Sequence, residues 1–150
     1  MKVSIEDVKR LREKTSAGIA DCRMALEEAG GKMDEAIEIL RKKGLERAEK
    51  KGDRQVKAGL VFSYVHHTGR VGSMVALACE TDFVAKTDEF QKLGKELAMQ
   101  VVANNPESIE ILLQEPYNRD PSKTISELVK ETIGKLGENI MVTNFKVVVI

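Results

Sequence analysis

The sequence predicts an α+β fold, in which a bundle of three helices precedes a small three-stranded antiparallel sheet covered by helices. Apolar residues recur at helical spacing in three successive stretches between residues 5 and 43. Strand-like alternation follows in residues 60–65 and 71–80, on either side of the turn-forming tetrapeptide HTGR. A third strand-like stretch, residues 140–150, comes after further helical stretches.

Three helices are expected at the N-terminal end. Ser4 and Asp7 resemble a capping box with a shorter acid and open the first helix near residue 5. The second helix is expected to end at the glycine pair 30–31, and the third before Gly44. The apolar stripes expected to form the core of this bundle are Ile5, Val8 and Leu11, then Ile19, Cys22, Leu26 and Ala29, then Met33, Ile37 and Leu40.

A change in charge divides the chain. Residues 1–57 carry 15 Lys and Arg against 12 Asp and Glu, whereas residues 58–150 carry 9 against 12. Eight of the basic residues lie with three acidic ones in residues 41–57, a helix-forming stretch that lacks an apolar stripe. Interleaved acids and missing aromatics favour a solvent-exposed linker over a nucleic-acid-binding arm. We therefore expect a three-helix domain at 1–43, a basic helical linker at 44–57 and an α+β core domain at 58–150.

Capping signals place two longer helices in the core domain. Thr87 can cap the first, and the capping-box pair Thr124 and Glu127 can open the second, which Gly137 ends. The stripe of the first is Phe90, Leu93, Leu97 and Val101. Between them we expect a short helical piece at 109–113 and a loop at 118–122.

The strands differ in their expected surroundings. Residues 71–80 should form a central, covered strand, because residues 75–79 are almost entirely apolar. Residues 140–150 would invite pairing with another copy if they formed an exposed edge, so we expect a homodimer through this C-terminal strand. One face of it is expected to carry Met141, Thr143, Phe145, Val147 and Val149, and the other Ile140, Val142, Asn144, Lys146, Val148 and Ile150.

The composition excludes several classes of protein. Apolar residues make up 42% and charged residues 32% of 150 positions, which is typical of a globular protein. The formal net charge of zero argues against nucleic acid as a partner of the chain as a whole. Cys22 and Cys79 form no CxxC motif, so we expect a reducing compartment. No signal-peptide pattern and no apolar run near the roughly 20 residues of a membrane span occur, so we expect a cytoplasmic protein without membrane contact.

The sequence predicts no catalytic centre. Neither GxxxxGK[ST] nor GxGxxG occurs to cradle a phosphate. His66 and His67 are adjacent on an expected strand, where neighbouring side chains point to opposite faces and cannot easily share one metal ion. Cys79 lies in an apolar run, where a thiol is usually inert. We therefore expect no enzyme activity, no cofactor and no metal site.

The stretch that most needs explanation is residues 79–90, CETDFVAKTDEF. An apolar strand ends there in three polar residues, Phe83 follows, and a helix resumes after Thr87. Phe83 can close over the core at the strand end, or it can stay exposed to meet a partner. Composition alone favours the first interpretation.

Residues 80–86, ETDFVAK, resemble the central motif of the elongation factor Ts family, of which TDFVA is a defining string. Ordered matches on both sides of it are SYVH at 63–66, GRVG at 69–72, PSKT at 121–124 and KLGENI at 135–140. The chain departs from the longer members of this family in having one copy of the core subdomain.

Residues 1–43 resemble the ubiquitin-associated-like domain that opens members of the same family. The matching residues are LR at 11–12, TSAG at 15–18, DCR at 21–23, AL at 25–26, AI at 36–37, LR at 40–41 and Gly44. Ser16 stands where the family usually has Gly, and Lys32 where it usually has Asp before the third helix.

The resemblance implies guanine-nucleotide exchange on elongation factor Tu, met in its GDP-bound and nucleotide-free forms during translation elongation. It implies that Asp82 and Phe83, flanked by Thr81 and Val84, push between two helices of the carrier's nucleotide domain. Supporting contacts that it implies are Leu136 and Gly137 beside that site, Ile19, Ala20 and Arg23 on the nucleotide domain, and His66 on a second domain. The alternative function is a non-catalytic protein-binding module that uses the three-helix domain.

Overall fold

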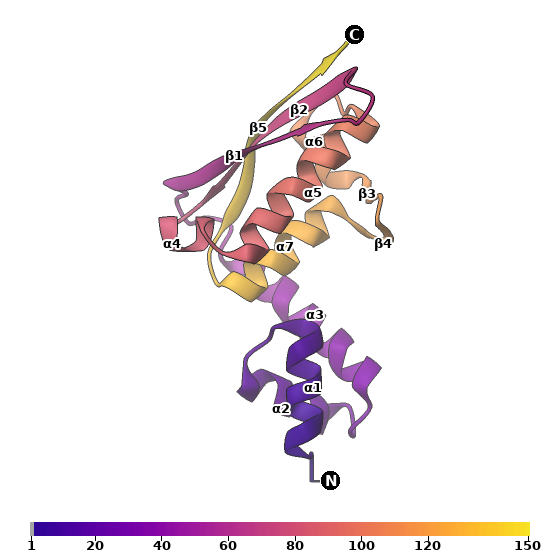
Figure 1. The fold of residues 1–150 in the computed structure, drawn as a ribbon. Helices are drawn as coiled ribbons and strands as arrows, with labels where there is room; N and C mark the ends of the chain where they lie inside the picture. The colour runs from indigo at the N-terminus through magenta and orange to yellow at the C-terminus, as the bar shows by residue number, and fades with distance from the viewer. Residues whose placement is uncertain (1) are drawn as a thin grey trace.

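The computed structural model describes residues 2–150 and shows a helical bundle joined to an α+β core, with the two chain ends at opposite ends of the molecule (Figure 1). The order of elements confirms the predicted fold class. In chain order they are α1 (Ile5–Thr15), α2 (Ile19–Glu28), α3 (Met33–Lys50), β1 (Ala58–Val65), β2 (Val71–Cys79), α4 (Asp82–Ala85), α5 (Asp88–Asn104), α6 (Ile109–Gln114), β3 (Pro116–Tyr117), β4 (Asp120–Thr124), α7 (Ile125–Leu136) and β5 (Ile140–Val149).

The N-terminal bundle has the three helices that the spacing predicts. The Ser4 side chain accepts a hydrogen bond from the Asp7 amide at the start of α1, as expected. The fully buried residues of the bundle are Leu11, Cys22, Ala25, Leu26 and Ala36. The predicted stripes were wrong at Ile5 and Ile19, which are 77% and 61% exposed. Each is the first residue of its helix and lies beyond the end of this small core.

The prediction that the third helix ends before Gly44 was wrong, because α3 continues to Lys50. Its second half packs on α7, where Gly44 and Gly134 meet so closely that a Cβ atom on Gly134 would lie 2.9 Å from the Gly44 Cα atom. Further along α3, Ala48 is buried in the core of the α+β part. The stretch 44–50 is therefore a packed helix that joins bundle and core.

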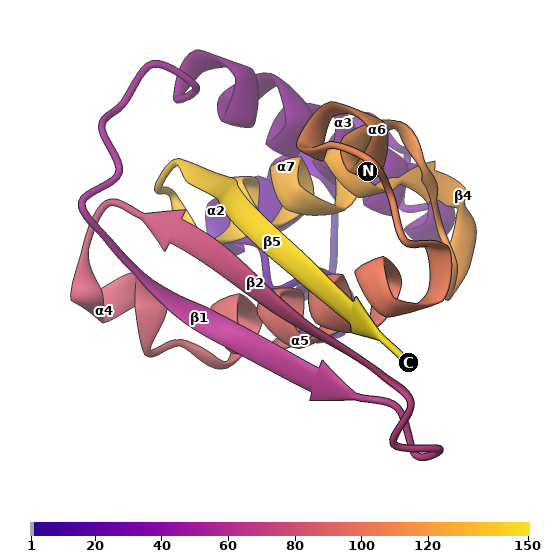
Figure 2. The same cartoon turned by 90° about the horizontal axis from the view of Figure 1, so that it is seen from above.

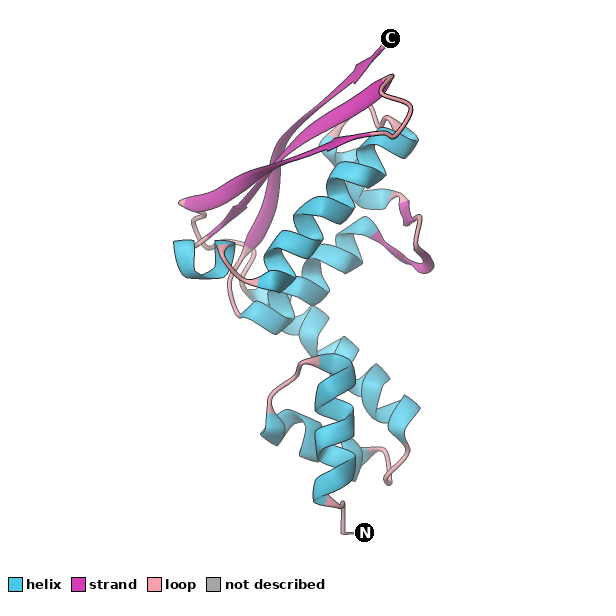
Figure 3. Cartoon of the chain, in the orientation of Figure 1, coloured by secondary structure: helices cyan, strands magenta, loops and turns pink. Residues whose placement is uncertain are grey.

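The three strands form an antiparallel sheet in the order β1-β2-β5, so β2 is central as predicted. Gly69 has a φ of 72° in the β1–β2 turn, which a glycine adopts without strain. Helices cover one face of the sheet and leave the other bare (Figure 3). The expectation of a covered β2 is therefore met on one face only: Val75, Leu77 and Cys79 are buried, while Met74 is 56% exposed.

A bulge in β5 overturns the predicted assignment of its two faces. Ala76 of β2 lies opposite Asn144 and Leu77 opposite Val142, so Thr143 is the extra residue. The shift reverses the alternation, and Ile140 and Val142 come to lie on the inner face with Phe145 and Val147. The outer face carries exposed Met141 and Val148.

The helices of the core follow their predicted signals. Thr87 caps α5, and Thr124 and Glu127 form the capping box of α7, which Gly137 ends at a φ of 77°. All four predicted stripe residues of α5 are buried. The expected short helical piece is α6. The expected loop at 118–122 was wrong in part, because β4 pairs with β3 in a second, two-stranded sheet.

Candidate functional site

Phe83 is 87% exposed, which contradicts the interpretation in which it closes over the core. It lies in α4, a single helical turn at the end of β2. The following residues of that turn, Val84 and Ala85, are 8% and 3% exposed and pack into the core. The turn therefore anchors itself by two small apolar side chains and presents an aromatic ring, with exposed Asp82 before it, to solvent.

Thr81 holds the start of this turn. Its side chain accepts a hydrogen bond from the Val84 amide at 3.4 Å and so caps α4. Its amide donates to Glu138 Oε1 at 2.9 Å, and its hydroxyl donates to Glu138 Oε2 at 2.7 Å. The hydrogen-bonding groups of the Thr81 side chain are thus engaged within the chain.

A matching contact runs in the opposite direction next to it. Glu80 Oε1 accepts from the Asn139 amide at 2.8 Å, just as Glu138 accepts from the Thr81 amide. Asn139 is 2% exposed, and its side-chain amide donates to the Arg54 and Gly52 carbonyls at 2.9 and 3.3 Å. We call Glu80, Thr81, Glu138 and Asn139 the reciprocal clasp. It ties the exposed turn to the junction of α7 and β5.

Glu138 and Asn139 lie in the KLGENI segment that matches the family, but the resemblance implies no role for either residue. The available signal was a carboxylate and an amide directly after the glycine that ends a helix. Leu136 and Gly137, which the resemblance implies as supporting contacts, lie at the C-terminal end of α7, directly before Glu138 of the clasp. Leu136 is half-buried against the core, and Gly137 is exposed.

The other predicted residues lie elsewhere. Ile19, Ala20 and Arg23 are exposed on α2 in the N-terminal bundle, where Arg23 pairs with Glu27 at 3.1 Å. His66 follows β1 at the end of the sheet opposite to α4 (Figure 2). The eight residues of β1 separate the two by roughly 25 Å at a strand's ~3.3 Å per residue. The structure therefore presents three distinct surfaces.

The sequence-based argument about the two histidines was wrong in its geometry. Both lie beyond Val65, the last residue of β1, so strand alternation does not separate them. Their ring centroids are 4.1 Å apart, and His66 Nδ1 lies 2.9 Å from the Thr68 hydroxyl. Within residues 2–150, no group of three or more His, Cys, Asp or Glu side chains is arranged to hold a metal ion.

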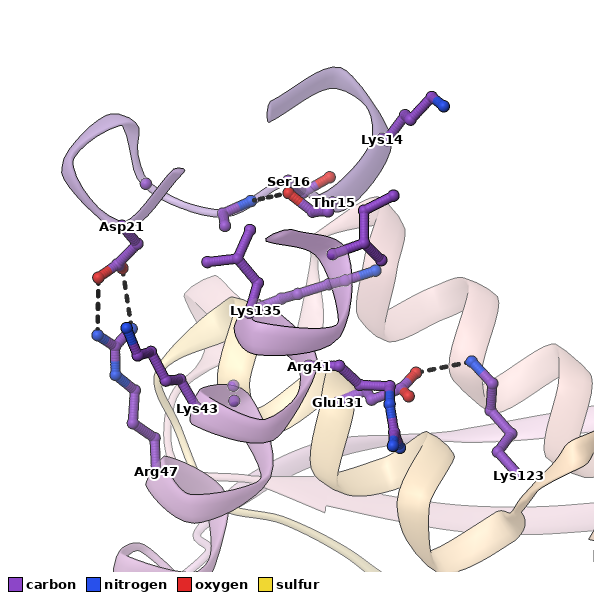
Figure 4. A pocket seen from close by; sticks show the side chains of 16 residues that line it. Lys14, Thr15, Ser16, Asp21, Arg41, Lys43, Arg47, Lys123, Glu131 and Lys135 are labelled. Atoms are coloured by element: carbon purple, nitrogen blue, oxygen red, sulfur yellow. Dashed lines mark hydrogen bonds and ion pairs between the residues drawn. The ribbon is translucent and has the colours of Figure 1, made fainter. Parts of the chain in front are cut away.

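A cavity of about 400 Å³ lies between the bundle and the core (Figure 4). Arg47 donates two hydrogen bonds of 2.9 Å to Asp21 on one side, and the Arg47 guanidinium lowers the pKa of that carboxyl. Lys123 pairs with Glu131 at 2.8 Å on the other side. The first pair joins α2 to α3, and the second joins β4 to α7 within the core. The second oxygen of Glu131, Oε1, is buried without a hydrogen-bond partner among the described residues.

A second cavity of about 400 Å³ lies beneath the β1–β2 hairpin, and Tyr64, His66 and Tyr117 are among the residues that line it. The Tyr117 hydroxyl donates to Glu96 Oε2 at 2.7 Å. Burial and this contact raise the pKa of Tyr117 to about 12.

Among the described residues, no helix has the length and apolar composition needed to span a membrane.

Comparison with known proteins shows which family the chain resembles. A family model described as elongation factor TS matches residues 80–150, which hold the exposed turn and the reciprocal clasp. Elongation factor Ts of Aquifex aeolicus is 48% identical over 97% of this chain, which spans 52% of that protein. Those of Thermoanaerobacter sp. and Fervidobacterium nodosum are 40% and 37% identical, and the chain covers 92% and 96% of them.

The last two alignments extend over 188 and 190 residues, so these relatives contain residues without a counterpart in this chain of 150. The similarity nevertheless spans bundle and core, in relatives of which the chain covers almost the whole length. The chain belongs to the elongation factor Ts family.

Proposed function

We propose that this member of a family of translation elongation factors promotes the release of GDP from elongation factor Tu. The observation that carries the proposal is Phe83, which is 87% exposed on a turn held by the reciprocal clasp. We call residues 81–84 the exchange wedge. In this proposal Asp82 and Phe83 enter between two helices of the carrier's nucleotide domain.

The physical basis is a balance of two free energies: burial of the Phe83 ring is favourable, and distortion of the carrier's magnesium site is unfavourable. Burying a phenyl ring in an apolar pocket contributes about 1.5–3 kcal/mol. That free energy can offset the displacement of a carrier helix that positions the magnesium ion, which requires nearly ideal octahedral coordination. The negative charge of Asp82 further disfavours phosphate groups nearby.

Exchange then follows from linkage. A factor that binds the nucleotide-free carrier more tightly than the GDP-bound carrier must weaken GDP binding by the same ratio. No covalent bond is made or broken, so this function requires no catalytic acid or base, no cofactor and no metal ion held by the chain itself. It would operate in the cytoplasm, where translation takes place.

The N-terminal bundle offers a second contact. Ile19 and Met24 are 61% and 51% exposed on α2, and exposed apolar side chains of this size gain free energy when a partner covers them. In the proposed function Ile19, Ala20 and Arg23 meet the nucleotide domain, while Leu136 and Gly137 support the wedge and His66 meets a second domain. The alternative is a non-catalytic protein-binding module that uses the three-helix domain.

A homodimer through β5 belongs to the same proposal. Within residues 2–150, β5 pairs only with β2, so its other edge is open. The adjoining bare face of the sheet carries Val61, Met74, Met141 and Val148, all 46% exposed or more. A second copy can pair with the open edge and cover this face. Light scattering should give the mass of two chains, and a monomeric mass at working concentration would contradict the homodimer.

The function itself is tested with elongation factor Tu loaded with a fluorescent GDP analogue. Addition of this protein with excess unlabelled nucleotide should accelerate loss of the analogue. A passive binding module would form a complex but leave the dissociation rate unchanged, and that result would contradict the proposed function.

A further inference from the structure

We infer that Glu138 is the positioning residue of the exchange wedge, and that its carboxylate holds α4 in the orientation that presents Phe83. This inference rests on the proposed function. It goes beyond that function because it assigns the geometry of the wedge to a residue on the opposite side of the site, 57 positions away in sequence from the Thr81 that it holds.

The α4 turn needs an external support. It comprises four residues, and a helix this short is unstable by itself in water. The cap from the Thr81 hydroxyl to the Val84 amide is 3.4 Å long, which is beyond the usual range for a strong hydrogen bond. The buried Val84 and Ala85 anchor one side of the turn, but Phe83 itself has 87% of its surface in solvent.

Glu138 supplies that support by accepting two short hydrogen bonds, both donated by Thr81. A threonine hydroxyl has one hydrogen to donate and two lone pairs that can accept. With its hydrogen directed to Glu138 Oε2 at 2.7 Å, the Thr81 hydroxyl turns a lone pair toward the Val84 amide. The Thr81 amide at 2.9 Å from Oε1 fixes the backbone of the same residue. Hydrogen bonds to an ionised acceptor are the stronger ones, so Glu138 holds both the cap and the backbone of Thr81.

The residues on either side of Glu138 fix the position of its carboxylate. Gly137 ends α7 in the left-handed conformation directly before it. Asn139, directly after it, is almost fully buried, and its hydrogen bonds reach Glu80, Gly52 and Arg54. The position of Thr81, and through it that of α4, is therefore set relative to α7, β5 and the segment after α3.

A positioning role has a specific kinetic consequence. If α4 samples several orientations, only the fraction of molecules with a correctly placed Phe83 can bind, and the apparent affinity falls in proportion to that fraction. Once the ring is inserted, the partner itself holds the turn. Removal of the Glu138 carboxylate should therefore raise the protein concentration for half-maximal exchange while the maximal rate of GDP release changes little.

The experiment measures release of fluorescent GDP from elongation factor Tu over a range of concentrations of each variant. We expect Glu138→Ala to raise the half-maximal concentration roughly tenfold, with the maximal rate within about twofold of wild type. Glu138→Gln keeps one carbonyl acceptor at nearly the same volume and should recover part of the loss. The control is Glu127→Ala, which removes a single carboxylate contact of 3.3 Å to the Thr124 amide at the start of α7 and should leave exchange within about twofold.

A double variant separates positioning from stability. If Glu138 acts through Phe83, adding Glu138→Ala to Phe83→Ala should cause no further loss, whereas a general loss of stability would add to it. The amides of Val84 and Ala85 should also exchange hydrogen faster in free Glu138→Ala protein than in wild type. If Glu138→Ala fails to fold, Glu138→Gln carries all three measurements.

The outcomes distinguish the two proposals. No acceleration of GDP release by wild-type protein overturns the proposed function and, with it, this inference. Normal exchange by Phe83→Ala leaves the function standing but overturns the role of Phe83 as the wedge and, with it, this inference. Impaired exchange by Phe83→Ala together with normal exchange by Glu138→Ala, additive losses in the double variant, or unchanged amide exchange in α4 overturns the positioning role alone.

Discussion

Gly44 of α3 and Gly134 of α7 touch through their backbones at the point where the N-terminal bundle meets the core. A Cβ atom on Gly134 would lie 2.9 Å from the Gly44 Cα atom and 3.0 Å from its carbonyl oxygen. The contact is asymmetric, because a Cβ atom on Gly44 would meet nothing within 4 Å. This crossing sets how the bundle surface with Ile19 stands relative to the wedge.

The asymmetry predicts opposite effects of the same substitution. Gly134→Ala should lower the free energy of unfolding by about 1–3 kcal/mol, because backbone atoms cannot move aside as a flexible side chain can. Gly44→Ala, in open space within a helix, should raise it by about 0.5–1 kcal/mol through the better helix propensity of alanine. Urea denaturation of both variants checks this, and equal effects of the two would contradict the described crossing.

The predictions from sequence succeeded where the signals are local. Thr87, Thr124 and Gly137 act within one helical turn of the residues they cap, so the ends of α5 and α7 follow from nearby sequence. The hairpin also follows, because Gly69 and the flanking alternation are adjacent.

The failures depend on contacts between distant residues. Helix α3 passes Gly44 because α7 packs there, and the faces of β5 reverse because β2 accommodates Thr143 as a bulge. At the candidate site, the resemblance implies a role for Asp82 and Phe83, whereas composition favoured a buried Phe83. The hydrogen bonds from Thr81 to Glu138 join segments whose order in the sequence does not indicate their proximity.

The bidentate pair of Arg47 and Asp21 predicts an acid-dependent contribution to stability. Because Arg47 lowers the pKa of Asp21 in the folded state, the contribution is present above the unfolded pKa of an aspartate and is lost as the pH falls through the folded value. Arg47→Gln should cost about 0.2–1 kcal/mol near pH 7, as expected for a partly exposed pair. Denaturation of both proteins at pH 7 and pH 3 should show the difference shrinking at low pH, and a constant difference would contradict the pairing.

Tyr117 should ionise only in strong alkali. Its pKa of about 12 lies above the ordinary tyrosine value of about 10, so its contribution to stability is present below the unfolded pKa and is lost as the pH rises through about 12. In Tyr64→Phe protein, Tyr117 is the remaining tyrosine of the two, and its ultraviolet titration can be followed directly. Adding Glu96→Gln should lower its pKa, because that change removes the adjacent negative charge. An unchanged titration would contradict the contact between Tyr117 and Glu96.

The central claim is that exposed Phe83 drives the release of GDP. Its most direct test compares Phe83→Ala with wild-type protein in the release of fluorescent GDP from elongation factor Tu, with Ile111→Ala, an exposed apolar residue on α6, as the matched control. Loss of about 1.5–3 kcal/mol of ring burial predicts that Phe83→Ala accelerates release roughly 10- to 100-fold less than wild type, while Ile111→Ala behaves as wild type. Full exchange activity in a Phe83→Ala protein with unchanged thermal unfolding would contradict the claim.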